Sequence, residues 1–266
     1  MKRIGIFLLL SIVSINRLLA GEHFAKIEPL KSITIKAEAN GEVLKSLKER
    51  EGEVVNGVIV QIDDRLNKKD LQSTLESLKL VEKMIDLNSK MVADLRKNMQ
   101  KKKSLYERVA PLSSSSVSQK DALYAAYVAA KSQYSATLEK ILNLKSQRVS
   151  LKQRIDLLRD TIEKKRVTVS NSYLYRLNVE TGEFVTVGMP LATVMNIQKG
   201  KLTLYLSADE LEGIKQKRIY IDGNKSSATI KKIWRVADTK YISSYRVEIE
   251  VPNVKKFSKL VKVEFK

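Results

Sequence analysis

Hydrophobic positions recur every seven residues along two long stretches of this chain. In the first stretch they are Leu71, Leu78, Ile85, Val92, Met99 and Tyr106. In the second the seven-residue series is Leu123, Ala130, Thr137, Leu144, Leu151 and Leu158. A companion series, Tyr127, Tyr134, Ile141, Arg148, Ile155 and Ile162, has Arg148 as its one charged member. This spacing keeps one apolar stripe of a helix facing a partner helix, and it is typical of a coiled coil.

A short break between the two stretches predicts an antiparallel helical hairpin. The first helix, capped by Asp64 or Asn67, is expected to run to about Arg108 before Pro111, which lacks an amide donor. Ser118 has a capping-box pattern and is predicted to cap the second helix, which continues to about Lys165. The hairpin core is assigned to Leu78, Ile85, Val92, Ile141, Leu144, Leu151 and Ile155.

Short β-branched runs and turn residues lie on both sides of the predicted hairpin. Segments 51–57 and 181–188 echo each other, because in each a pair of glycines frames a short valine-bearing strand. This echo predicts two halves of one β module, split by the hairpin. Alternation after residue 198 predicts a small antiparallel β-barrel. The expected fold class is α+β, with units at 27–64, 65–166, 167–197 and 198–266.

The first twenty residues have the pattern of a signal peptide. Lys2 and Arg3 precede an apolar run over 4–15, and Ala20 offers a cleavage position. The expectation is export to the periplasm with cleavage after Ala20. A retained N-terminal anchor in the inner membrane is the alternative.

Composition excludes several classes of chemistry. The chain contains no cysteine, which rules out disulfides, thiolate metal sites and cysteine nucleophiles, and His23 is its single histidine. We therefore expect no catalysis by cysteine or histidine and no thiolate or multi-histidine metal site, and no cofactor is expected. The net charge of +19 falls to +16 when Lys2, Arg3 and Arg17 leave with the signal peptide. Because the lysines are spread along the chain, we expect solvated coiled-coil faces and not nucleic-acid binding, with attraction to an anionic membrane surface as the second interpretation.

The order of these segments resembles the periplasmic adaptor, or membrane fusion, proteins (HlyD-like, including adaptor subunits of RND-type efflux pumps). The resemblance covers roughly residues 30–255. It implies that the two β halves form a lipoyl-like barrel-sandwich hybrid and that the barrel faces an inner-membrane transporter of the RND or ABC type. It also implies a hairpin that reaches a TolC-like outer-membrane channel and a homo-oligomer, usually a hexamer, without catalytic activity.

The sharpest local resemblance is at the expected tip of the hairpin. Family members that dock onto TolC-like channels carry an Arg, a Leu four residues later and a Ser about seven beyond that. Arg108 and Leu112 have this spacing, whereas Ser118 follows after six residues. The resemblance implies that these three residues dock onto the channel, with a loop one residue shorter than the family pattern.

Two other protein classes share parts of this pattern. Biotinyl and lipoyl carriers have a similar β module, but they present a modified lysine within Met-Lys-Met or Asp-Lys-Ala, and neither triplet occurs in this sequence. A self-associating structural coiled-coil scaffold of the cell envelope would explain the heptads. It would not explain the paired β halves or the terminal barrel.

Overall fold

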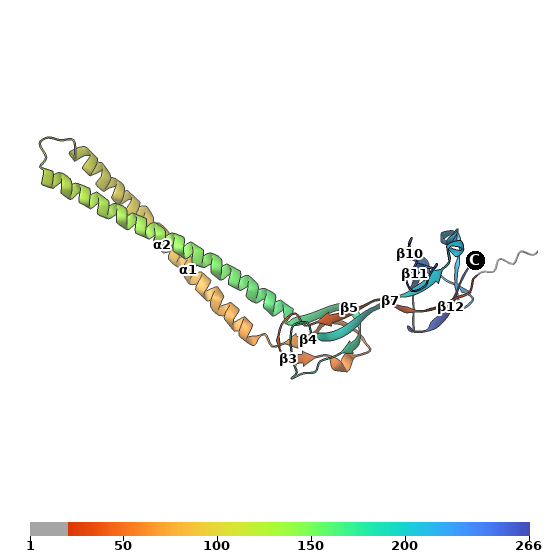
Figure 1. The fold of residues 1–266 in the computed structure, drawn as a ribbon. Helices are drawn as coiled ribbons and strands as arrows, with labels where there is room; N and C mark the ends of the chain where they lie inside the picture. Colours follow the sequence, from red (N-terminus) through yellow and green to blue (C-terminus); the bar gives the residue numbers. More distant parts are fainter. Residues whose placement is uncertain (1–20) are drawn as a thin grey trace, which may run out of the picture.

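The structure is a computed structural model that describes residues 21–266, arranged as three parts in a line (Figure 1). A long helical hairpin forms one end, a β unit lies at its root, and a second β unit lies at the other end. The predicted signal peptide and its cleavage after Ala20 lie outside the described residues. The α+β class and the long hairpin are confirmed.

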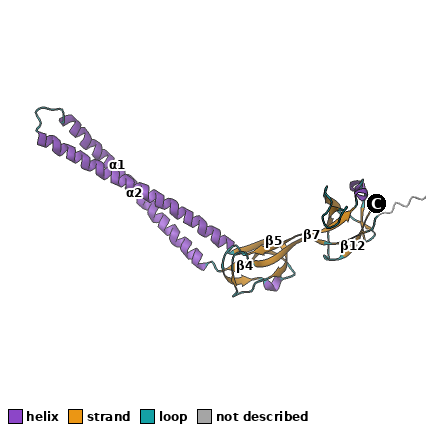
Figure 2. Cartoon of the chain, in the orientation of Figure 1, coloured by secondary structure: helices purple, strands orange, loops and turns teal. Residues whose placement is uncertain are grey.

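The hairpin consists of α1 (Arg65–Val109) and α2 (Val117–Lys164), which pack against each other as antiparallel helices (Figure 2). At 1.5 Å per residue, the 45 residues of α1 extend about 68 Å. Asp64 occupies the N-cap position of α1, but its side chain makes no capping hydrogen bond there. Its buried carboxylate instead pairs with Lys68 at 2.9 Å. The alternative cap, Asn67, lies inside the helix.

The predicted cap of the second helix is wrong by two residues. Ser116 occupies the N-cap with an extended backbone, and its hydroxyl accepts a hydrogen bond from the Gln119 amide at 3.2 Å. Ser118 is already the second helical residue. The run of four serines at 113–116 offers several equivalent caps, so where the loop closes decides which hydroxyl faces the free amides.

Four residues of α2 are buried between the helices, namely Ala130, Ile141, Leu144 and Ile155. On α1 the buried residues are Thr74, Val81 and Asn88, which form a seven-residue series of their own. The predicted core positions Leu78, Ile85, Val92 and Leu151 are half-buried. Sequence reasoning missed the Thr74 series because two of its three buried members are polar. Both satisfy their side chains within the helix, through Thr74 Oγ1 to the Asp70 carbonyl at 2.7 Å and Asn88 Nδ2 to the Met84 carbonyl at 2.6 Å.

The first β unit contains strands from both sides of the hairpin. They are β2 (Glu28–Lys36), β3 (Gly41–Ser46), β4 (Val54–Ile62), β5 (Arg166–Leu177), β6 (Phe184–Val185) and the first half of β7 (Pro190–Leu206), with a short 3-10 turn η1 (Lys48–Arg50). Strand β4 pairs antiparallel with β5, and Gln61 lies opposite Arg166. The hairpin therefore leaves and re-enters this unit at adjacent strand ends, over one core that includes Ile59, Leu174 and Leu191.

The two glycine-framed segments of the predicted echo share a backbone feature. Gly52 and Gly57 have φ values of 86° and 99°, and Gly182 and Gly188 have 92° and 89°. Residues with a Cβ rarely adopt this left-handed region, which explains why glycine recurs at these positions. The first pair brackets the start of β4, which has nine residues and contains Gly57, and the second pair brackets the two-residue strand β6.

The second β unit has its own core and combines both ends of the described chain. Its elements are β1 (His23–Lys26), the rest of β7, α3 (Ala208–Leu211), η2 (Ile214–Gln216), β8 (Ile219–Ile221), β9 (Asn224–Lys225), β10 (Thr229–Ile233), β11 (Tyr245–Pro252) and β12 (Leu260–Phe265). Strand β1 pairs with β12, so residues 23–26 belong to this unit, which the sequence did not reveal. Strand β7 runs through both units and pairs with β2, from Lys36 opposite Pro190 to Glu28 opposite Lys201.

Candidate interaction sites of the hairpin

The tip of the hairpin is a compact, ordered turn. The Leu112 amide donates to the Val109 carbonyl at 3.1 Å, which extends the end of α1 by one turn. Just below, the rings of Tyr106 and Tyr124 pack with their centroids 5.2 Å apart and join the two helices. The side chains of the tip are therefore held by a backbone that these two contacts fix in place.

All three predicted docking residues lie at this tip and face solvent. Arg108 donates only one long bond, from Nε to the Ser104 carbonyl at 3.3 Å, and it has no carboxylate partner among residues 21–266. Leu112 is 48% exposed, and Ser118 is exposed as well. The structure adds Val117, which is 75% exposed beside the cap. An apolar residue directly after a serine run was the signal that could have identified it.

The hairpin also carries two apolar stripes that point away from its core. The α1 stripe consists of Leu80, Met84, Leu87 and Met91, and the α2 stripe consists of Leu138, Leu142 and Val149. Each is spaced three, four or seven residues apart, so its members lie on one side of their helix. The side chains of both stripes are exposed, whereas the core side chains are buried or half-buried.

The heptad assignment places these stripes on opposite faces of the hairpin. With Ile85 and Ile141 at position a, the α1 stripe falls at c and g, whereas the α2 stripe falls at b and e. In an antiparallel pair of helices, the g positions of one helix lie beside the g positions of the other, and the e positions lie beside the e positions. The bond from Arg154 to Asp70 at 2.8 Å joins two g positions, so it lies on the same side of the hairpin as the α1 stripe. The α2 stripe lies on the opposite side, where the e positions adjoin.

The two stripes also stand at the same height along the hairpin. Arg154 contacts Asp70 near the root, and Tyr106 contacts Tyr124 near the tip. Halfway between these contacts, Leu87 of the α1 stripe is level with Leu138 of the α2 stripe. The hairpin thus offers matched apolar surfaces on two opposite sides.

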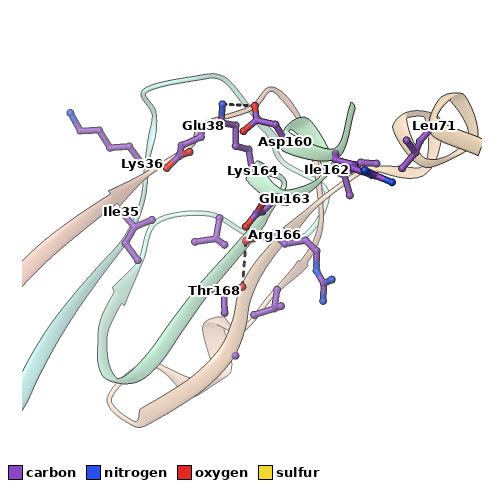
Figure 3. A pocket seen from close by; sticks show the side chains of 14 residues that line it. Ile35, Lys36, Glu38, Leu71, Asp160, Ile162, Glu163, Lys164, Arg166 and Thr168 are labelled. Carbon is purple, nitrogen blue, oxygen red and sulfur yellow. Dashed lines mark hydrogen bonds and ion pairs between the residues drawn. The ribbon is translucent and has the colours of Figure 1, made fainter. Parts of the chain in front are cut away.

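A groove of about 1040 Å³ lies where α2 meets the first β unit (Figure 3). Its lining alternates in sign, with Lys36 and Glu38 from the end of β2 and Asp160 and Lys164 from α2. Lys164 donates to Asp160 at 2.7 Å, and this bond raises the pKa of Lys164. Among all the lining side chains four are basic and three are acidic, and the two signs are interspersed, so the groove has no cluster of one sign that would select an ionic ligand.

The root of the hairpin is fastened by polar contacts. Arg65 donates to both carboxylate oxygens of Asp63, at 2.9 and 2.8 Å. These hydrogen bonds lower the pKa of Asp63 to about 2. The Ile62 amide donates to the Lys165 carbonyl at 2.8 Å, which ties the end of β4 to the end of α2.

The described residues meet the requirements of neither a site with three metal-binding side chains nor a membrane-spanning helix. Within residues 21–266, no group of three acidic, histidine or cysteine side chains is placed to hold a metal ion. Neither α1 nor α2 contains a stretch apolar enough to cross a bilayer.

The sequence matches no protein-family model and no curated relative, but its fold matches solved structures. MacA from Actinobacillus actinomycetemcomitans is 15% identical with a TM-score of 0.62, over 93% of this chain and 79% of that one. A MacA-MexA chimera carrying the Pseudomonas aeruginosa MexA α-hairpin is 16% identical with a TM-score of 0.59, over 93% and 81%. A membrane fusion protein from Streptococcus pneumoniae is 13% identical with a TM-score of 0.52, over 93% and 99%.

Proposed function

Because the chain has the fold of membrane fusion proteins, we propose that it is a periplasmic adaptor subunit of a tripartite efflux or secretion system. In this role it joins an inner-membrane transporter of the RND or ABC type to a TolC-like outer-membrane channel. The observation that carries the proposal is a long hairpin that projects from paired strand ends and exposes its tip. The protein acts by bridging and sealing, without catalysis.

The β units supply the base of this bridge. We assign residues 27–64 and 167–197 to a lipoyl-like barrel-sandwich hybrid and residues 198–266 to a small β-barrel that faces the transporter. The hairpin, residues 65–166, spans the distance to the channel. The shared strand β7 supports a stiff link between the two β units, because one ladder continues through both.

The tip carries the contact with the channel. Arg108 has unused guanidinium donors that suit channel carbonyls or carboxylates, since no described carboxylate occupies them. Leu112 supplies an exposed apolar knob, and Ser118 adds a hydroxyl on the first turn of α2. The packing of Tyr106 on Tyr124 beneath them fixes the tip before docking, so binding costs little conformational entropy.

The lateral stripes support a homo-oligomer, which we propose to be a hexamer in the complex. The α1 stripe of one copy would pack on the α2 stripe of the next, which is a heterologous contact. Because the stripes are level, successive copies need no shift along the hairpin axis. A contact repeated without such a shift closes into a ring when the rotation between successive copies divides a full turn, and we propose a rotation of this kind.

The tip assignment can be tested by cross-linking in cells. The chain has no cysteine, so a cysteine introduced at Leu112 is its only thiol and can cross-link to a partner channel. We expect Arg108→Glu in this background to abolish the cross-link and to reduce efflux. Arg96→Glu, an exposed arginine on the same helix away from the tip, is the matched control. Unchanged cross-linking and efflux in the Arg108→Glu variant would refute docking through this tip.

A self-associating coiled-coil scaffold of the cell envelope is the second candidate, and the lateral stripes favour it as well. The two functions differ in what the tip does. In a scaffold, Leu142→Glu on the α2 stripe would disturb assembly, while Arg108→Glu would leave every function intact. In an adaptor, both changes impair export.

A further inference from the structure

The loop between β10 and β11, residues 234–244, exposes large aliphatic side chains. Ile242 is 86% exposed, more than any other large hydrophobic side chain within residues 21–266, and Val236 is 78% exposed. Neither residue contributes to the core of the second β unit. Packing within the described chain therefore gives no reason for these two aliphatic side chains to be exposed to solvent.

The loop is nevertheless well organised. The Trp234 amide donates to the Arg246 carbonyl at 2.9 Å, and the Asp238 amide donates to the Ser244 carbonyl at 2.8 Å. The Asp238 carboxylate accepts from the Lys240 and Tyr241 amides at 2.8 and 3.2 Å. Tyr241 stacks on Tyr205 with ring centroids 4.2 Å apart. Five of the eleven backbone amides of the loop thus have an acceptor within the chain, which lowers part of the cost of moving the loop into a less polar medium.

Several cations lie on this loop or at its base. Arg235 and Lys240 lie on the loop, and Lys232 and Arg246 flank the Trp234 ring at 4.3 and 4.5 Å. A groove of about 350 Å³ beside the loop adds two further cations, Lys215 and Lys231, and the apolar side chain of Ile230.

The acidic groups near these cations are already engaged. The Asp238 carboxylate accepts from backbone amides, Glu248 pairs with Arg246, and Glu250 pairs with Lys199 at 2.8 Å and with Lys231 at 3.4 Å. The other four cations form no ion pair within residues 21–266, so the loop and its groove keep an excess of positive charge.

We propose that the loop over residues 234–244 inserts Val236 and Ile242 into the surface of an anionic lipid bilayer, while the neighbouring cations bind lipid phosphates. Exposed aliphatic side chains accompanied by lysine and arginine suit an interface between headgroups and acyl chains. A protein partner would favour an interface whose core is depleted of charged residues. Trp234 at the base of the loop suits the headgroup level, where tryptophan is enriched. This inference goes beyond the adaptor function and does not depend on docking at the hairpin tip.

The chain contains a built-in probe for this contact. Trp234 is its only tryptophan, so tryptophan emission reports on this loop whatever other parts of the chain touch a membrane. The full chain is mixed with vesicles of phosphatidylglycerol and phosphatidylcholine, or of phosphatidylcholine alone. We expect a blue shift and quenching by lipids brominated on their acyl chains with the anionic vesicles. The signal should weaken in high salt and in the absence of phosphatidylglycerol.

Paired variants separate the apolar and the electrostatic contributions. Val236→Ser with Ile242→Ser should weaken the partitioning reported by Trp234 roughly tenfold or more, because two aliphatic side chains no longer leave water. Arg235→Glu with Lys240→Glu should weaken partitioning to anionic vesicles by about tenfold or more and leave neutral vesicles unaffected. Phe24→Ser with Leu260→Ser is the matched apolar control, because these side chains are 64% and 63% exposed in the same unit. Lys255→Glu with Lys256→Glu is the charge control.

Three outcomes would overturn the proposal. Trp234 emission could stay unchanged with anionic vesicles, or the control pairs could weaken partitioning as much as the loop pairs. Emission could also respond to a purified inner-membrane transporter in detergent but not to vesicles, which would assign the loop to a protein contact. Circular dichroism of each variant verifies that the fold is retained.

Discussion

The ammonium group of Lys165 donates a hydrogen bond to the side-chain oxygen of Asn67 at 2.8 Å, and so joins the end of α2 to the first turn of α1. The same group donates to the Asp63 carbonyl at 2.7 Å. A single side chain thus ties both helices to the strand from which the hairpin emerges. This root sets the direction of the hairpin relative to the first β unit.

Removing the Lys165 ammonium should loosen the root. We expect Lys165→Met to lower the free energy of unfolding by about 1 kcal/mol, because Asn67 and the Asp63 carbonyl lose a charged donor. Lys152→Met, an exposed lysine on α2, should be neutral. Thermal denaturation followed by circular dichroism measures both, and equal effects would contradict a special role for Lys165.

A charge between the helices should unfold the hairpin, whereas a charge beside the core should not. Leu144 is buried and Leu142 is 64% exposed. Leu144→Asp should cost a few kcal/mol, roughly 2 to 4, because its carboxylate loses water without gaining a partner. Leu142→Asp should change the melting temperature of the monomer little. Similar melting curves for the two variants would disprove the core register.

The cap of α2 can be assigned by two serine substitutions. Ser116→Ala should destabilise the hairpin by about 1 kcal/mol, because the Gln119 amide loses its acceptor. Ser118→Ala should have little effect on stability, since its hydroxyl is not the cap. Urea unfolding measures the difference, and a larger loss for Ser118→Ala would reverse the assignment.

The Asp63–Arg65 pair predicts a specific pH dependence. Hydrogen bonds from Arg65 lower the pKa of Asp63 from 3.8 to about 2, so the folded state favours the ionised carboxylate. The resulting stability is present above the unfolded pKa of 3.8 and is lost as the pH falls through about 2. Wild type should therefore melt above Asp63→Asn at neutral pH, and the gap should close between these values. A gap that persists at lower pH would contradict this origin, and Asp94→Asn is the exposed control.

The lateral stripes should govern association between copies. We expect Leu87→Glu on the α1 stripe, or Leu142→Glu on the α2 stripe, to weaken self-association roughly tenfold or more, because each buries a charge against an apolar neighbour. Leu157→Glu is a control at an exposed leucine outside both stripes. Sedimentation velocity across a concentration series would detect the change. Association that survives both stripe variants would remove these surfaces from the interface.

Most of the hairpin could be predicted from local pattern. The regular spacing from Leu71 to Tyr106 and from Leu123 to Leu158 can be read directly from the sequence. It predicts two helices that each have one apolar side. The helices end within a residue or two of the expected positions because Pro111 and the serine run interrupt that pattern. The buried series through Asn88 escaped notice because a polar residue in a core is satisfied by its own helix turn, which spacing alone does not reveal.

What the sequence determined by itself was therefore the hairpin and the presence of β structure on either side of it, since both depend on periodicities of a few residues. The tertiary structure decided the rest. It selected Ser116 over Ser118 as the cap, placed β1 beside β12, and set the two apolar stripes level on opposite faces. Each of these outcomes depends on which distant segments meet. Local propensity cannot decide that, because the contacts form between residues that lie far apart along the chain.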